Sequence, residues 1–409
     1  MLVGHAVREI IAGARKELLA LKSTQWIRYF YYDHSESEMS RLEFLLATYK
    51  DLYRSTGLLP DMPLCVGLKI TGRCNLACRH CWALLTGRHN PTDHLTRILS
   101  ELADAGVAHV NISGGEPLTH PDVLEILACA KSYGLAVGLY TNAVESATRL
   151  AHLLDSSTDY VHVSFDGVSQ TAFTRQRGLD YREALRANVQ HMVAEGLKVR
   201  LHMTVSDANV DELVDTYEEA QRLGVWTFSF TPIIGINRGK KFGKKLDSLK
   251  YFLYAFEIRR RQLVDGGKHV RVFMQPHVLL TGLEALFGDD LDEMLEPISL
   301  RAEPVYDVFT TCCTNADMTV ILAPSIERDP CLGSLADEEF RVIWQRSHSF
   351  RQSLFNRDFR GSRCETCRYL SICQGGDWVD AYNRTGTTGG PGHGCFAELR
   401  TCQDHLLSV

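Results

Sequence analysis

Three cysteines that lie close together in the sequence are the residues best suited to metal chemistry. Cys74, Cys78 and Cys81 occupy the segment RCNLACRHC and follow the spacing C-x-x-x-C-x-x-C. An iron-sulfur cubane needs four ligands, so a cluster held by three cysteine thiolates keeps one iron open. A small molecule can chelate such an open iron. The spacing therefore indicates a cluster with a free coordination position.

A zinc site is the alternative interpretation of this segment, since His80 can supply a fourth ligand. Zinc sites of this type usually pair one C-x-x-C with a distant second pair. Here the triad follows an apolar run at 65–70, and a glycine-glycine-glutamate sequence, Gly114, Gly115 and Glu116, follows another apolar run. Glycine allows close backbone approach and a carboxylate suits a cationic partner. The combination favours a chelated cofactor over zinc.

A second group of cysteines lies near the C-terminus and is also typical of a metal site. Cys364, Cys367, Cys373 and Cys395 follow the pattern C-x-x-C-x5-C with one further cysteine. Four thiolates would complete a closed cluster, and structural zinc is the alternative because C-x-x-C sites are frequent in zinc proteins. The chain has 13 cysteines, and this odd number argues against a disulfide framework.

The segments that must position the first triad alternate between short apolar runs and amphipathic stretches. Strands are expected at 66–70, 108–112, 136–140, 160–165, 198–205 and 226–231. Apolar spacing of three and four predicts helices at 92–105, 121–133, 181–195 and 210–223. Six such units form a parallel sheet of the α/β class, which we expect to be a partial (β/α)6 barrel of the TIM type. The triad and the glycine pair then lie at the carboxyl ends of strands, where such barrels carry their chemistry.

The cysteine motif at the end of the first strand and the glycine-glycine-glutamate at the end of the second resemble the radical S-adenosylmethionine (SAM) superfamily over residues 66–235. In that family the amino and carboxylate groups of SAM bind the open iron of a [4Fe-4S] cluster. One-electron reduction of the sulfonium then yields a 5'-deoxyadenosyl radical that abstracts a hydrogen atom. The resemblance implies that the triad holds the cluster and that Gly114, Gly115 and Glu116 face the methionine amine.

Residues at the other strand ends are further candidates for binding SAM: Asn142, Ser164, Asp166, Thr204 and Pro232. By the resemblance, Ser164 and Asp166 lie where the superfamily often contacts the ribose and the SAM carboxylate. Thr204 and Pro232 lie near the adenine, and His80 holds the position of an aromatic residue beside that ring. Residues of these types also form helix caps and turns, so both roles stay open.

The C-terminal cysteines resemble the SPASM extension of radical SAM enzymes, which carries two auxiliary four-iron clusters. The resemblance assigns Cys364, Cys367, Cys373 and Cys395 to the outer cluster. Candidate ligands of the other cluster are Cys312, Cys313, Cys331 and Asp377. Asp377 stands where the pattern expects a cysteine, and carboxylate is a weaker ligand for such clusters than thiolate. This site is carboxylate-ligated, completed by the adjacent cysteine pair at 312–313, or degenerate.

The resemblance implies a radical SAM oxidoreductase. Relatives with this extension mostly modify peptides, so we expect oxidative formation of a C–C or C–S crosslink, or dehydrogenation, in natural-product maturation. Sulfatase maturation is disfavoured, because Leu332 stands where those enzymes have an aspartate base. The alternatives are a dehydrogenase or epimerase of a small-molecule pathway and, more remotely, a non-catalytic iron-sulfur or zinc scaffold. An electron donor such as flavodoxin or ferredoxin is the expected protein partner, and no residue is singled out as a general base.

The composition is that of a cytoplasmic enzyme with more than one domain. The chain has 409 residues, of which 45% are hydrophobic and 23% charged, and its net charge is -6. These values do not suggest a nucleic-acid-binding protein, and no apolar run reaches the ~20 residues that a membrane span needs. Three parts are expected: a helical prefix at 1–62, the barrel at 63–300 and a SPASM-like domain at 301–409.

Overall fold

The structure of the chain is a computed structural model. It describes residues 61–144, 158–233, 235–242, 246–265, 270–272, 276–288, 311–323 and 331–391, with Thr56, Leu59, Leu291, Ile326 and Cys395 as single positions. The helical prefix expected at 1–62 lies almost entirely outside these residues and stays a prediction.

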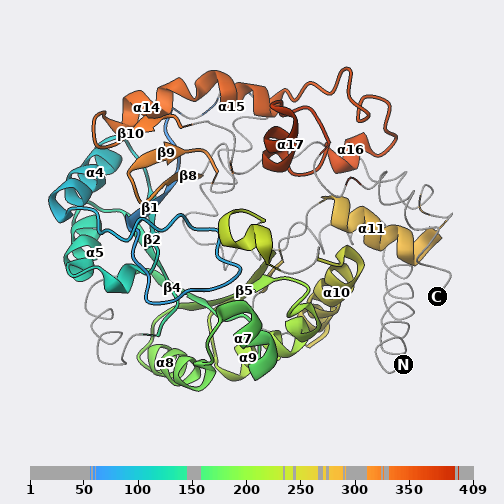
Figure 1. The fold of residues 1–409 in the computed structure, drawn as a ribbon, viewed down its shortest axis with the longest axis horizontal. Helices are drawn as coiled ribbons and strands as arrows, with labels where there is room; N and C mark the ends of the chain where they lie inside the picture. The colour runs from blue at the N-terminus through green and yellow to red at the C-terminus, as the bar shows by residue number, and fades with distance from the viewer. Residues whose placement is uncertain are drawn as a thin grey trace.

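A curved sheet forms the frame of the molecule (Figure 1). Within the described residues it has ten strands in the order β10-β9-β8-β1-β2-β3-β4-β5-β6-β7. Its central strands pair in parallel and in sequence order: β1 (Cys65–Thr71), β2 (His109–Gly114), β3 (Ala136–Thr141), β4 (Tyr160–Ser164), β5 (Val199–Val205) and β6 (Thr227–Pro232). The short β7 (Val270–Val272) continues the parallel order beside β6. The six predicted strands and the partial barrel are confirmed.

Helices lie around the outer side of the curved sheet (Figure 1). Those predicted from apolar spacing are present: α4 (Thr92–Asp104), α5 (Val123–Ser132), α8 (Arg182–Ala194) and α9 (Leu213–Arg222), the last preceded by the 3-10 turn η3 (Val210–Glu212). Among the described residues of the barrel, three helices were not predicted: α7 (Gln170–Arg177), α10 (Ser248–Asp265) and α11 (Pro276–Phe287).

The two faces of the sheet differ in chemistry. Val161 and Val163 of β4 are fully buried in the apolar core together with Leu185 of α8, so alternate strand positions face the helices. The intervening residue His162 therefore faces the concave side, as does Tyr140, its neighbour on β3 in the strand register. A strand buried on both faces would be apolar throughout. The polar inner positions indicate a barrel interior available for a ligand.

The C-terminal part of the chain contributes strands to the same sheet. Strand β8 (Thr311–Thr314) runs parallel to β1 and places Cys312 beside Val66 and Cys313 beside Gly67. Strands β9 (Thr319–Ile321) and β10 (Gly333–Ser334) follow in antiparallel order. The described residues of this part also form four short helices: α14 (Phe340–Arg346), α15 (His348–Phe355), α16 (Leu370–Cys373) and α17 (Trp378–Thr385). The sheet therefore runs across the boundary predicted at residue 300.

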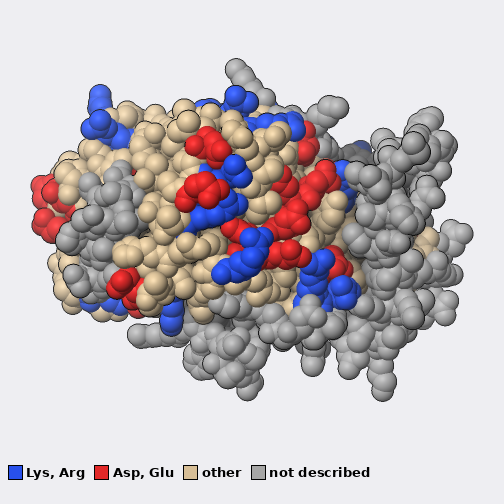
Figure 2. All heavy atoms as spheres, turned by 90° about the horizontal axis from the view of Figure 1, so that it is seen from below, with Lys and Arg blue, Asp and Glu red and all other residues tan. Residues whose placement is uncertain are grey.

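The outer surface carries both signs of charge. Figure 2 shows Lys and Arg interspersed with Asp and Glu on the face seen from below. Ion pairs between successive outer elements, such as Lys250 with Asp211, belong to this pattern. In the described part of the chain, no helix combines the length and the apolar character needed to cross a membrane.

Candidate active site

The loop that follows β1 carries the three cysteines of the first motif. Cys78 is buried, and Cys74 and Cys81 are half-buried. Burial, with smaller contributions from the nearby Glu116, Cys78 and Cys81, raises the pKa of the Cys74 thiol to about 11. Burial likewise raises the pKa of Cys78. Metal ligation requires thiolates, so these thiols must release their protons as a metal binds.

The donor set fits an iron-sulfur cluster. Three soft thiol ligands lie on one loop, and the described cysteines form no disulfide with one another. Within the described residues, no three His, Cys, Asp or Glu side chains are arranged to hold a single metal ion. In a cubane each cysteine binds a different iron, so the sulfurs need not converge on one point.

The glycine-glycine-glutamate segment packs against the start of this loop. The amide of Gly115 donates to the Thr71 carbonyl at 2.8 Å, and the amide of Glu116 donates to the Arg73 carbonyl at 2.8 Å. A side chain at Gly115 would meet the Arg73 carbonyl oxygen at 2.1 Å. The two segments approach each other as closely as glycine permits, which gives a physical reason for the glycine.

The carboxylate of Glu116 connects the ends of β2 and β3. It accepts hydrogen bonds from the Thr141 hydroxyl at 2.6 Å, the Asn142 amide at 2.7 Å and the Leu118 amide at 3.1 Å. The Asn142 side chain in turn donates to Asn75 in the cysteine loop at 2.8 Å. Two predicted site residues, Glu116 and Asn142, are therefore brought together beside that loop.

A buried ion pair lies beneath the cysteine loop. Asp166, which follows β4, is fully buried, and its Oδ2 atom lies 2.5 Å from Nε of Arg177 at the end of α7. Its Oδ1 atom accepts from the Thr204 amide at 2.8 Å. Although burial alone would raise the pKa of Asp166, Arg177 and His80 hold it below its ordinary value. Both oxygens are engaged within the chain, which favours a positioning role, while direct contact of Asp166 with SAM stays a prediction.

His80 joins this ion pair to the loop. Its Nε2 atom lies 3.5 Å from Asp166 Oδ2, and its Nδ1 atom lies 3.0 Å from the Gln176 carbonyl oxygen. The ring also meets Phe242 edge to face, with centroids 6.3 Å apart. Burial lowers the pKa of His80. The ring is therefore an oriented, neutral group between the loop and the sheet.

The remaining predicted residues lie at the same edge of the sheet. Ser164 ends β4 and is half-buried, and Pro232 ends β6 opposite Val205 of β5. The carbonyl of Thr204 accepts from the Gln176 side chain at 2.7 Å. The structure thus brings the predicted strand-end residues together at the carboxyl edge. Their contact with SAM stays a prediction.

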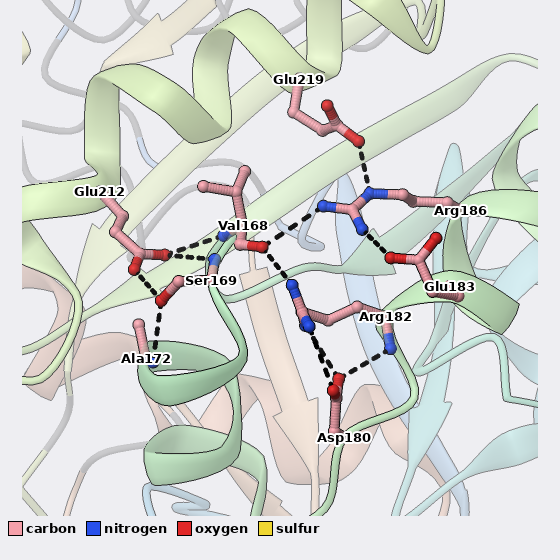
Figure 3. Close-up of polar contacts among 9 residues, drawn as sticks. All are labelled: Val168, Ser169, Ala172, Asp180, Arg182, Glu183, Arg186, Glu212 and Glu219. Atoms are coloured by element: carbon pink, nitrogen blue, oxygen red, sulfur yellow. Dashed lines mark hydrogen bonds and ion pairs between the residues drawn. The ribbon is translucent and has the colours of Figure 1, made fainter.

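The turn between β4 and α7 is held from two sides (Figure 3). The Glu212 carboxylate accepts hydrogen bonds from the amides of Val168 at 2.8 Å and Ser169 at 3.0 Å, and from the Ser169 hydroxyl. On the other side, the guanidinium groups of Arg182 and Arg186 donate to the Val168 carbonyl. This network fixes the start of α7, which ends at Arg177 beneath the cysteine loop.

The four C-terminal cysteines of the predicted outer cluster influence one another electrostatically. Burial raises the pKa of Cys373 to about 12, and the neighbouring Cys395, Cys364 and Cys367 add to the effect in that order. The four thiols therefore lie within electrostatic reach of one another. Whether they hold a cluster or zinc stays a prediction.

The predicted ligands of the other auxiliary site are less well defined. The side chain of Asp377 caps α17 by accepting from the Val379 amide at 2.8 Å. Cys331 is exposed. Cys312 and Cys313 lie on β8, but their side chains are outside the description. The composition of this site stays a prediction.

Sequence reasoning missed Arg177 and Gln176 because it missed α7. The helix sequence QTAFTRQR has no continuous apolar stripe. Its ends did carry a signal: Ser169 caps the first turn by accepting from the Ala172 amide, and Gly178 ends the helix with φ of 83°. Serine before a helix and glycine after it are the usual start and stop residues, respectively.

Sequence reasoning also missed an aromatic stack on the inner face of the sheet. Tyr140 stacks on His162 with centroids 4.1 Å apart, and His162 lies 4.7 Å from His202. The ring nitrogens of His202 lie 2.9 Å from the Ser229 hydroxyl and 3.3 Å from the Thr231 hydroxyl. Burial lowers the pKa of His202 to about 4 and that of His162 well below its ordinary value. Both rings are therefore neutral near pH 7.

Comparison with known proteins identifies similar sequences. The model of the radical SAM superfamily matches residues 68–236. The mycofactocin maturase MftC of Mycolicibacterium smegmatis is 30% identical over 329 residues, which cover 77% of this chain and 78% of that protein. The AdoMet-dependent heme synthase of Methanosarcina barkeri is 23% identical over 78% of this chain and 92% of that protein.

The fold is similar to that of a solved enzyme. SuiB of Streptococcus suis bound to S-adenosylmethionine superposes with a TM-score of 0.68 at 15% identity, over 95% of this chain and 87% of that one. SuiB bound to its precursor peptide SuiA gives a TM-score of 0.67 at 16% identity over the same shares.

Proposed function

This chain belongs to the radical SAM superfamily, and we propose on that premise that it oxidatively modifies a peptide during natural-product maturation. One observation carries the proposal: the three free thiols of the first motif lie on a loop that is held against the glycine-glycine-glutamate segment. The relative named mycofactocin maturase and the SuiB structure with a precursor peptide support the peptide as substrate class.

The residues of the loop and the strand ends have separate tasks in this proposal. Cys74, Cys78 and Cys81 would hold the cluster, and the segment from Gly114 to Glu116 would bind the methionine amine. When bound, the cluster and SAM supply a 5'-deoxyadenosyl radical that removes a hydrogen atom. The chain itself orients the substrate and excludes water from the site.

The inner face of the sheet suits the substrate. Tyr140, His162 and His202 present aromatic faces and neutral hydrogen-bonding atoms toward the concave side. The Nδ1 atom of His162 is buried and has no hydrogen-bond partner among the residues that the structure describes. A buried polar atom in this condition costs free energy unless a ligand or water satisfies it. We assign this stack to the substrate residue that loses hydrogen.

The C-terminal cysteines complete the proposal. Cys364, Cys367, Cys373 and Cys395 would hold an auxiliary cluster that accepts the second electron of a net oxidation. A flavodoxin or ferredoxin would supply the first electron. The free thiols suit a reducing compartment such as the cytoplasm, where we place the reaction.

The test is anaerobic co-expression of the chain with the short peptides encoded beside its gene, followed by intact mass analysis. We expect one peptide to lose hydrogens with the wild-type chain and to stay unchanged with Cys78→Ala. Solvent deuterium gained without loss of hydrogens would indicate epimerisation instead.

The same experiment separates the peptide from a small-molecule substrate, which the similarity to a heme synthase keeps in view. Unchanged peptides, together with 5'-deoxyadenosine formed by the purified wild-type enzyme, would refute the peptide and retain radical chemistry. Absence of deoxyadenosine from the reduced enzyme would refute the radical chemistry itself.

A further inference from the structure

A buried arginine touches the most buried cysteine of the first motif. The guanidinium Nη1 of Arg177 donates to Cys78 Sγ across 3.7 Å. Arg177 is only 6% exposed. A guanidinium stays protonated in proteins, and Asp166 Oδ2 lies 2.5 Å from Nε of Arg177 as its counter-charge. A permanent positive charge therefore lies against a thiol that would bind iron.

The end of α7 is fixed against the cysteine loop. The Gln176 carbonyl accepts from the Arg79 amide at 3.0 Å and lies 3.0 Å from His80 Nδ1. The start of the same helix is held by Glu212 (Figure 3). With both ends held, the guanidinium has little freedom to leave the sulfur. The contact is a consequence of the fold.

We propose that Arg177 sets the reduction potential of the cluster held by Cys74, Cys78 and Cys81, with Asp166 as its counter-charge. The inference rests on the proposed function, because it requires that cluster. Hydrogen bonds to the cysteine sulfurs and local net charge are main determinants of a cluster's potential. Reduction adds one negative charge, so a nearby cation and an N–H donor favour the reduced state.

The two members of the ion pair act in opposite directions. Arg177 stabilises the reduced cluster, whereas the carboxylate of Asp166, fully buried beside it, destabilises that state. Burial strengthens both effects, because the low-dielectric interior screens charge weakly. Removing the cation must lower the potential, and removing the anion must raise it. A purely structural ion pair would produce no such opposition of sign.

The experiment is an anaerobic EPR-monitored redox titration of the full chain with its clusters reconstituted. The EPR signal that is absent from Cys78→Ala identifies the cluster of interest among the others. Four variants are compared: Arg177→Met, Arg177→Lys, Asp166→Asn and Arg175→Met. Arg175 lies on the same helix and is exposed, so it is the matched control.

We expect Arg177→Met to lower the equilibrium constant for reduction of the cluster about tenfold. For a one-electron couple this lowers the midpoint potential by about 59 mV. Asp166→Asn should shift the midpoint in the opposite direction, and Arg175→Met should match the wild type. Iron per chain is measured in parallel, so that a lost cluster is not taken for a shifted one.

Wild-type midpoints in both Arg177→Met and Asp166→Asn would overturn the proposal, as would shifts of the same sign. If Arg177→Met binds no iron, the midpoint potentials of Arg177→Lys, which keeps the charge, and of Asp166→Asn are used instead. An unshifted midpoint potential in Asp166→Asn then overturns the proposal. A wild-type chain without any signal dependent on Cys78 would instead refute the cluster and with it the proposed function.

Discussion

The close approach of Gly115 to the cysteine loop makes a sharp prediction for Gly115→Ala. The new Cβ atom would lie 2.1 Å from the Arg73 carbonyl oxygen, 2.6 Å from its carbon and 3.1 Å from Cys74 Cβ. The first two are backbone atoms, which cannot turn away as a flexible side chain can. The loop must therefore move at the residue that precedes the first cysteine.

The cost follows from packing and hydrogen bonding. Overpacking of this kind costs about 1 to 3 kcal/mol, and moving the loop also strains the hydrogen bond from the Glu116 amide to the Arg73 carbonyl. We expect a total loss of about 3 kcal/mol in the free energy of unfolding. The displacement of Cys74 should also reduce cluster binding, by about four irons per chain.

The assays are urea unfolding of the iron-free chain and iron analysis after anaerobic reconstitution. Gly235→Ala is the control, because a Cβ at Gly235 meets nothing within 4 Å. This variant should match the wild type in both assays. Gly115→Ala with wild-type stability and wild-type iron would refute the argument that the two segments are in contact.

Three further predictions concern the stability of the iron-free chain and, for Asp377, the iron bound per chain. The pKa values of His109 and His202 are lowered by burial to about 4, so the unfolded chain binds more protons between pH 4 and the ordinary histidine value of about 6.5. The free energy of unfolding should fall as the pH drops through that window. In His109→Asn the thermal midpoint should depend less on pH than in the wild type, and an unchanged dependence would contradict this. Glu212→Ala should lower the free energy of unfolding in urea by about 2 kcal/mol, because it leaves two amides without their acceptor. The control Glu183→Ala, which removes an exposed ion pair in Figure 3, should lower it by under about 1 kcal/mol. Equal losses in the two variants would be evidence against the network. Asp377→Ala should cost about 1 kcal/mol through the lost cap, while Asp377→Asn should keep both stability and iron per chain. Iron lost from Asp377→Asn at unchanged stability would instead indicate a carboxylate ligand.

Local sequence patterns predicted the elements that carry their own signal. Strand β4 reads as an apolar run that ends in Ser164, and α4 shows apolar residues at helical spacing. The same kind of apolar run marked β1 and β2, whose ends place the cysteine loop and the glycine pair at one edge of the sheet. The same patterns could not reveal α7, because its eight residues are mostly polar and its position depends on Glu212, which lies far along the chain.

Contacts between distant residues explain the rest of what the sequence concealed. Arg177 and Cys78 are 99 positions apart, and no local rule connects them. The inner stack of Tyr140, His162 and His202 comes from three strands, each of which contributes one ring. Such a residue is equally compatible with a turn or an edge. Only the strand register reveals that the three rings meet.

The pairing of β8 with β1 links the first cysteine motif directly to two of the predicted auxiliary ligands. Thr314 of β8 accepts from the Lys69 amide at 3.1 Å and donates to the Gly67 carbonyl at 3.3 Å. The strand that carries Cys312 and Cys313 is therefore bonded to the strand that leads into the first cysteine motif. Because the backbone ladder sets the register, the positions of Cys312 and Cys313 relative to β1 are fixed by the sheet. An electron passing from substrate to an auxiliary cluster would then cross a distance set by this fixed register.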